Sequence, residues 1–168
     1  MRILGIDPGL ATVGIGILER GRNEKLTLLD YCTIETTKGM PRALRLQELL
    51  GDLQKLLKEW KPDLAVLEKL YFQKNVKTAI DVAEARGVIL LTLAEEGIEV
   101  LEPTPSELKL AITGDGKADK LQMRDMLCHL LHVEKDAFSG ERDDTTDAIA
   151  LGVYGALSSR LTALTEAV

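Results

Sequence analysis

The sequence predicts one α/β domain over residues 1–168, with a mixed five-stranded sheet and helices on both faces. Three observations lead to this prediction. Strand-like segments separated by short turns come first, leucine-rich segments with helical spacing follow, and two short apolar runs lie between those helices. The length suits a single domain, since domains of about 100–150 residues are commonest.

The first three strands are expected to form an antiparallel meander over 2–7, 12–19 and 25–34. The first run is apolar and ends in Asp7, where a Pro-Gly pair breaks it. The second alternates β-branched and small residues, which is typical of a strand. Short turns between the three runs favour hairpin connections.

The remaining elements alternate helix and strand. A leucine stripe predicts a helix that Pro41 opens and Pro62 ends. The unbroken apolar run at 64–67 is expected to be a strand covered on both faces, and it ends in Glu68. Further elements are expected as a helix over 76–96, a strand over 98–101, a short helix from Ser106, and helices over 118–132 and 143–159. This order is that of the ribonuclease-H-like arrangement in outline.

The net charge of −6 argues at first against a nucleic-acid partner, because such proteins usually carry a basic face. A carboxylate cluster that binds cations would add negative charge of its own, so the position of the basic residues matters more. Several of them are expected near the predicted carboxyl ends of the strands: Lys69, Lys74, Lys77, Arg86, Lys109, Lys117 and Lys120.

Composition also bears on location. Cys32 and Cys128 lie far apart and form no metal-binding pair of the CxxC type. The longest apolar runs fall short of the roughly 18–20 residues that span a membrane. The chain reaches Asp7 too early for a signal peptide. We therefore expect a cytoplasmic protein with no membrane partner.

Four carboxylates are the candidate site: Asp7, Glu68, Asp144 and Asp147. The first two follow strands that we expect to be parallel neighbours, and sites in open α/β sheets gather beyond the carboxyl ends of such strands. The last two are three residues apart, so they share a helix face. Magnesium takes oxygen ligands, and two such ions about 3.5–4 Å apart can hold the attacking and leaving oxygens of a phosphoryl displacement. The pattern indicates magnesium-dependent cleavage of phosphodiesters.

Each carboxylate also has a structural interpretation. Asp7 could belong only to a Pro-Gly turn, and Asp143 or Asp144 could only cap a helix. Asp143 also shares a helix face with Asp147, four residues on, so the choice between Asp143 and Asp144 stays open. A zinc site at His129 and His132 is rejected, because no third ligand accompanies the pair.

Five short motifs occur in register between residue 3 and about residue 151. They are Gly5-Ile6-Asp7-Pro8-Gly9 with Gly14 and Gly16, Glu68 with a following aromatic and Lys74-Asn75, Ala85-Arg86-Gly87-Val88, Gly114-x-Gly-x-Ala-x-Lys120-x-Gln122, and Asp144-x-x-Asp147-Ala148-x-Ala150. Together they resemble the RuvC-type Holliday junction resolvases. Any one motif is weak, but five in order are specific.

The resemblance implies a homodimer that binds a four-way DNA junction and nicks two strands symmetrically during recombination and repair. It implies two Mg²⁺ per site, with Mn²⁺ as a substitute, held by the four carboxylates, and a branch-migration complex as an optional partner. Lys120 would stabilise the scissile phosphate. Tyr71 stands where the family has a phenylalanine, and it can also stack on a base. The implied DNA-binding residues are Tyr71, Phe72, Lys74, Asn75, Lys109, Lys117 and Lys120.

Three other functions compete with this one. A nuclease that acts on RNA or on other branched nucleic acid would use the same carboxylates. A non-catalytic junction binder would not need all four acids. A phosphotransferase of the actin-like and sugar-kinase type also opens with Gly-x-Asp-x-Gly, but it needs two lobes, and 168 residues are too few for them.

Overall fold

The computed structural model describes residues 1–69, 76–135, 137–138 and 140–165. Its strands form one five-stranded sheet in the order β3-β2-β1-β4-β5. The first three strands pair antiparallel, whereas β4 pairs parallel with β1 and with β5. The predicted mixed sheet is therefore confirmed. The strands are β1 (Arg2–Asp7), β2 (Thr12–Arg20), β3 (Leu26–Glu35), β4 (Leu64–Leu67) and β5 (Glu99–Leu101).

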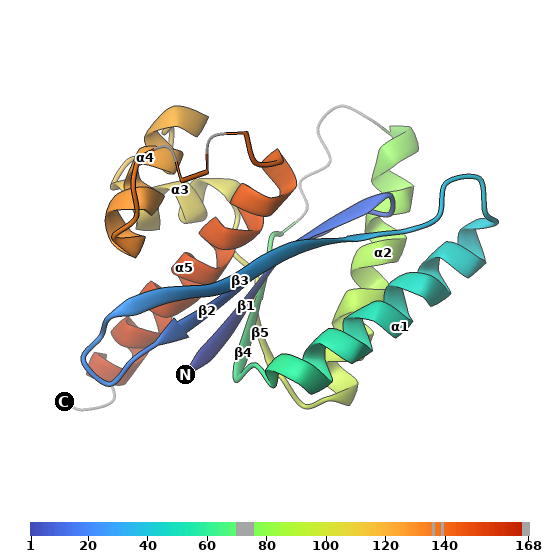
Figure 1. The fold of residues 1–168 in the computed structure, drawn as a ribbon, viewed down its shortest axis with the longest axis horizontal. Helices are drawn as coiled ribbons and strands as arrows, with labels where there is room; N and C mark the ends of the chain where they lie inside the picture. The colour runs from blue at the N-terminus through green and yellow to red at the C-terminus, as the bar shows by residue number, and fades with distance from the viewer. Residues whose placement is uncertain (70–75, 136, 139, 166–168) are drawn as a thin grey trace.

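Helices cover both faces of the sheet (Figure 1). One face carries α1 and α2, and the other carries α5, with α3 and α4 packed beside it. The bounds are α1 (Arg42–Trp60), α2 (Val76–Glu95), α3 (Pro105–Thr113), α4 (Lys120–Leu131) and α5 (Asp143–Thr165). In the part of the chain that the structure describes, no helix is both long enough and apolar enough to cross a membrane.

The helices predicted over 76–96 and 118–132 are observed one or two residues shorter at their ends, as α2 and α4, and α3 and α5 also differ from their predicted bounds. We expected α3 to begin after the turn at Pro105, but Pro105 is its first residue, where a missing backbone N–H costs nothing. Thr104 caps this helix in a reciprocal capping box with Glu107. The final helix continues to Thr165 rather than ending at 159, because residues 160–165 contain no glycine or proline to stop it.

The face under α1 and α2 is filled by large aliphatic side chains. Alternate residues of the central strands point to it and meet the buried stripes of the two helices. This interdigitated layer fixes α1 and α2 to the sheet. Its principal members are Leu4, Ile6, Val13, Ile15, Ile17, Leu49, Leu53, Leu57, Ala85, Ile89 and Leu93.

The opposite face brings α5 almost onto the backbone of the sheet. A Cβ atom added at Gly5 would lie 2.0 Å from the carbonyl oxygen of Ala148, and one at Gly14 would lie 2.0 Å from that of Asp144. Only glycine permits this approach. The first turns of α5 are thereby held over the end of β1, where Asp7 lies.

Candidate active site

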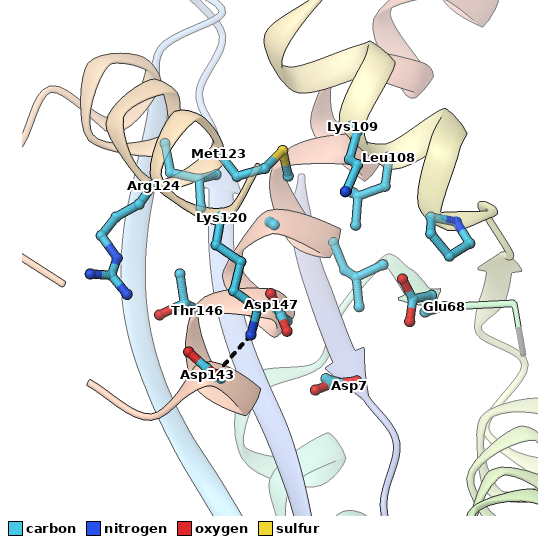
Figure 2. Close-up of a pocket in the computed structure, with 14 residues that line it drawn as sticks. Asp7, Glu68, Leu108, Lys109, Lys120, Met123, Arg124, Asp143, Thr146 and Asp147 are labelled. Atoms are coloured by element: carbon cyan, nitrogen blue, oxygen red, sulfur yellow. Dashed lines mark hydrogen bonds and ion pairs between the residues drawn. The ribbon is translucent and has the colours of Figure 1, made fainter. Parts of the chain in front are cut away.

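Four carboxylates line one pocket of about 180 Å³ (Figure 2): Asp7, Glu68, Asp143 and Asp147. Asp7 ends β1, Glu68 follows β4, and Asp147 lies one turn into α5. Because Ile6 and Leu67 pair in register on parallel neighbouring strands, the next residue of each strand leaves the sheet at the same edge. The strand ends thus bring Asp7 and Glu68 together, and the close packing of α5 adds Asp147.

Asp7 carries the strongest electrostatic perturbation in the pocket. Its pKa is raised from 3.8 to about 8, mainly by burial and then by the negative charges of Asp147, Glu68 and Asp144, while the charge of Lys120 opposes the rise. A buried carboxylate beside other carboxylates is costly to ionise. Either a bound proton or a nearby cation offsets this cost, so the pocket favours the binding of positive charge.

The pKa values of Glu68 and Asp147 are shifted in the same direction. The pKa of Glu68 is raised by burial and then by Asp147, and Lys109 opposes the rise. Burial also raises the pKa of Asp147, against the charge of Lys120. The two lysines therefore face the carboxylates, and each offsets part of their mutual repulsion.

The structure separates the two adjacent acids at the start of α5. Asp143 lines the pocket and accepts a hydrogen bond of 2.7 Å from the Lys120 ammonium (Figure 2), with both side chains largely exposed. Asp144 is half-buried and lines a neighbouring groove with Leu10 and Arg45. Its charge nevertheless reaches the pocket, since it helps to raise the pKa of Asp7.

The predicted DNA-binding residues divide into three groups. Lys109 on α3 and Lys120 on α4 line the pocket. Lys117 lies on the turn between these helices, outside the pocket lining. The remaining DNA-binding candidates lie outside the described residues: Tyr71, Phe72, Lys74 and Asn75.

Sequence reasoning missed one cation in the pocket. Arg124 follows Lys120 by one turn of α4 and lines the same pocket, with its guanidinium on the side away from Asp7 and Glu68 (Figure 2). The spacing of four residues could have indicated it, because such residues share a helix face. Its charge helps to lower the pKa of Asp143, after the larger effect of Lys120.

The two histidines do not form a helical pair. His132 is the left-handed residue that ends α4, with φ of 54°, whereas His129 lies in the last turn of the helix. Among the described residues, no group of three or more His, Cys, Asp or Glu side chains is arranged to hold a metal ion unaided. The carboxylate pocket is thus open rather than a closed cage of protein ligands.

A mixed sheet in this order, with acids and lysines gathered over the ends of β1 and β4, defines a nuclease of the ribonuclease-H-like class. Comparison with known proteins gives the family. The model of the crossover junction endodeoxyribonuclease RuvC matches residues 3–154. The chain belongs to this family of Holliday junction resolvases, which hydrolyse phosphodiester bonds.

Individual members of the family match nearly the whole length of this chain. The RuvC of Thermotoga petrophila is 42% identical over 99% of this chain and 98% of its own length. That of Caldicellulosiruptor saccharolyticus is 40% identical over 95% and 94%, respectively. The structure of T. thermophilus RuvC in complex with Holliday junction substrate has a TM-score of 0.86 at 25% identity and covers 96% of both chains.

Proposed function

We propose that this chain resolves four-way DNA junctions by paired, symmetric nicks in a reaction that depends on Mg²⁺. The observation that carries the proposal is the Asp7 carboxylate, which is held beside other acids with its pKa raised to about 8. Membership of the resolvase family supplies the substrate class. The negative charge of the acids would attract a cation to the place where the phosphate must react.

The donor set fits a hard divalent cation. Every pocket acid offers carboxylate oxygen, which is the ligand type that Mg²⁺ prefers, and the described residues that line the pocket include no thiol or imidazole. Mg²⁺ usually keeps several waters and takes only one or two carboxylates with substrate phosphates. An open group of acids therefore suits a site that DNA completes.

In this proposal Asp7, Glu68 and Asp147 hold the cation, and Asp144 helps from the neighbouring groove. Bound Mg²⁺ would activate a water molecule and neutralise charge on the phosphate. Lys120 would donate hydrogen bonds to the phosphate as its negative charge grows, which requires exchange of its bond to Asp143 for one to DNA. Lys109 and Arg124 would orient the strand beside it.

The proposal includes a homodimer, because two symmetric nicks require two active sites. The exposed face of α2 supports it, since small and apolar residues repeat there at helical spacing: Ile80, Ala83, Gly87 and Leu91. A Cβ atom at Gly87 would meet nothing within 4 Å, so a partner helix could approach closely. Leu93, by contrast, is buried in the core. A branch-migration partner and a cytoplasmic location remain predictions.

The test is cleavage of a synthetic four-way junction by the full chain, with the nicks mapped on each strand. We expect paired nicks in Mg²⁺ or Mn²⁺ and none in excess chelator. Asp7→Asn should abolish cleavage and leave junction binding measurable in a gel-shift assay. Full cleavage by Asp7→Asn, or in chelator, would refute the metal-site proposal. Faster cleavage of an RNA–DNA hybrid or linear duplex would favour the competing nuclease function.

The roles of the adjacent acids can be separated by matched variants. We expect Asp144→Asn to weaken Mn²⁺ binding to the free protein, because its charge acts on Asp7. Asp143→Asn should leave Mn²⁺ affinity nearly unchanged, because Asp143 is exposed and paired with Lys120. The reverse result would make Asp143 the metal ligand.

A further inference from the structure

One conspicuous arginine next to the pocket takes no part in the chemistry proposed above. Arg86 lies on α2, within the Ala85-Arg86-Gly87-Val88 motif, and its side chain is only 16% exposed. Its Nε donates to the backbone carbonyl oxygen of Glu68 at 3.3 Å. Its terminal nitrogen forms an ion pair with the carboxylate of Glu102, which directly follows β5.

These contacts bridge the ends of two parallel strands. Val66 of β4 pairs with Leu101 of β5, so the residues that follow the two strands emerge side by side. The backbone N–H of Lys69 donates to the carbonyl oxygen of Pro103 at 2.8 Å. This hydrogen bond links the two chain segments just beyond the ends of β4 and β5. Glu68 therefore lies between the pairing of β4 with β5, which precedes it, and the hydrogen bond from Lys69 to Pro103, which follows it.

The Arg86 side chain is suited to hold the backbone of Glu68 in place rather than to bind a solvent-exposed phosphate. A guanidinium presents several N–H donors in a rigid plane, so one side chain can serve a carbonyl and a carboxylate together. Most of the Arg86 side chain is removed from water, and burial lowers its pKa. The ion pair with Glu102 keeps the charge satisfied where α2 packs against the sheet.

We propose that Arg86, braced by Glu102, is a positioning residue that fixes the backbone of Glu68 and so directs its carboxylate into the metal-binding pocket. The inference rests on the proposed function, in which Glu68 holds the cation. Groups that orient metal ligands affect affinity strongly, and their loss typically weakens metal binding or activity by about 10–100-fold. No contact of Arg86 with DNA is needed for this role.

The test is Mn²⁺ binding to the free full-length protein, followed by the electron paramagnetic resonance signal of unbound Mn²⁺. We expect Arg86→Met to weaken the affinity by about 10-fold or more. Arg86→Lys should give an intermediate loss, because an ammonium lacks the planar fork that serves both partners. Glu102→Gln should remain close to wild type, since its amide oxygen still accepts a hydrogen bond, whereas Glu102→Ala should show a partial loss.

Arg42 provides the matched control. It forms ion pairs from α1 to Asp81 and Glu84 of the same helix α2, at 3.0 and 3.2 Å, and it lines no part of the pocket. Arg42→Met should leave Mn²⁺ affinity and cleavage unchanged, with melting temperatures recorded for both variants. Junction affinity in metal-free buffer should be equal for wild type, Arg86→Met and Arg42→Met.

The outcomes separate the alternatives. Unchanged Mn²⁺ affinity in Arg86→Met and in Glu102→Ala would overturn the inference. So would an equal loss in Arg42→Met, which would indicate general destabilisation, or a loss of metal-free junction binding in Arg86→Met, which would make Arg86 a DNA contact. If Arg86→Met does not fold, Glu102→Ala alone decides. Failure of the wild type to bind Mn²⁺ would instead refute the proposed function.

Discussion

The two faces of the sheet are built by opposite means. Under α1 and α2, large aliphatic side chains such as Leu53 and Ile89 fill a layer between helix and strand. Under α5, Gly5 and Gly14 remove the side chains, and the helix lies against the strand backbone. The first face keeps its helices at side-chain distance, whereas the second brings helix residues directly over the sheet edge.

This difference separates stability from chemistry. A filled aliphatic layer stabilises the fold in proportion to the apolar surface it buries. A glycine-lined contact instead sets the position of Asp144 and Asp147 relative to Asp7, and the charge repulsion among these acids works against folding. We therefore expect substitutions on the first face to change stability and those on the second to change cleavage.

The largest expected effect is on the aliphatic face. Leu53→Ala removes a fully buried side chain from α1 and should lower the free energy of unfolding by about 2–5 kcal/mol. Denaturant unfolding measures this change. Below the transition, the folded variant should cleave junctions at the wild-type rate per molecule. A proportionate loss of cleavage in fully folded protein would remove the distinction between the faces.

Gly14→Ala tests the close contact of α5. The new methyl group would lie 2.0 Å from the carbonyl oxygen of Asp144, so the helix or the strand must shift. A misplacement of about 1 Å can cost about 10²-fold in rate, and this corresponds to roughly 2.7 kcal/mol in the barrier. Single-turnover cleavage at saturating protein measures it, with circular dichroism confirming the fold. Wild-type cleavage would show that α5 can move without consequence.

The acid cluster makes metal-free stability depend on pH. The Asp7 pKa is about 8 in the folded chain against 3.8 as its ordinary value, so between these values the folded state binds the extra proton. The Asp7 contribution therefore favours folding at low pH and declines as pH rises from about 4 to about 8. The slope is at most about 1.4 kcal/mol per pH unit.

Urea unfolding across this pH range, in chelator, measures that slope. Asp7→Asn should show a shallower decline than wild type, since its side chain does not titrate. Mn²⁺ should restore stability at pH 8, where its binding displaces the fewest protons. Parallel curves for wild type and Asp7→Asn would show that repulsion in the pocket does not act on folding.

The smallest effect is expected at Gly51, in α1 on the opposite face from α5. A Cβ atom there would meet nothing within 4 Å, so Gly51→Ala should raise the free energy of unfolding by about 0.5–1 kcal/mol through helix propensity alone. Thermal unfolding measures the gain, and cleavage should be unchanged. Compared with Gly14→Ala, the Gly51→Ala variant would show that adding a methyl group stabilises an open helix position but disrupts a position where the backbone is crowded.

Much of the fold could be predicted because its signals are local. The strand over 2–7 was predicted where β1 lies, and the run at 64–67 where β4 lies. The orientation of α2 could not be predicted, because its apolar residues are spread around the helix. Leu93 is buried and Leu91 is 60% exposed, although both are leucines two residues apart.

The sequence by itself determined the order of elements and the acids that end β1 and β4, because strand period, turn residues and strand ends are properties of neighbouring residues. Only the tertiary structure decided that Asp143 binds Lys120 while Asp144 faces another groove. It also decided that Arg86 reaches Glu68. Contacts of this kind join elements far apart in the chain, and packing distances rather than local pattern select which side chains meet.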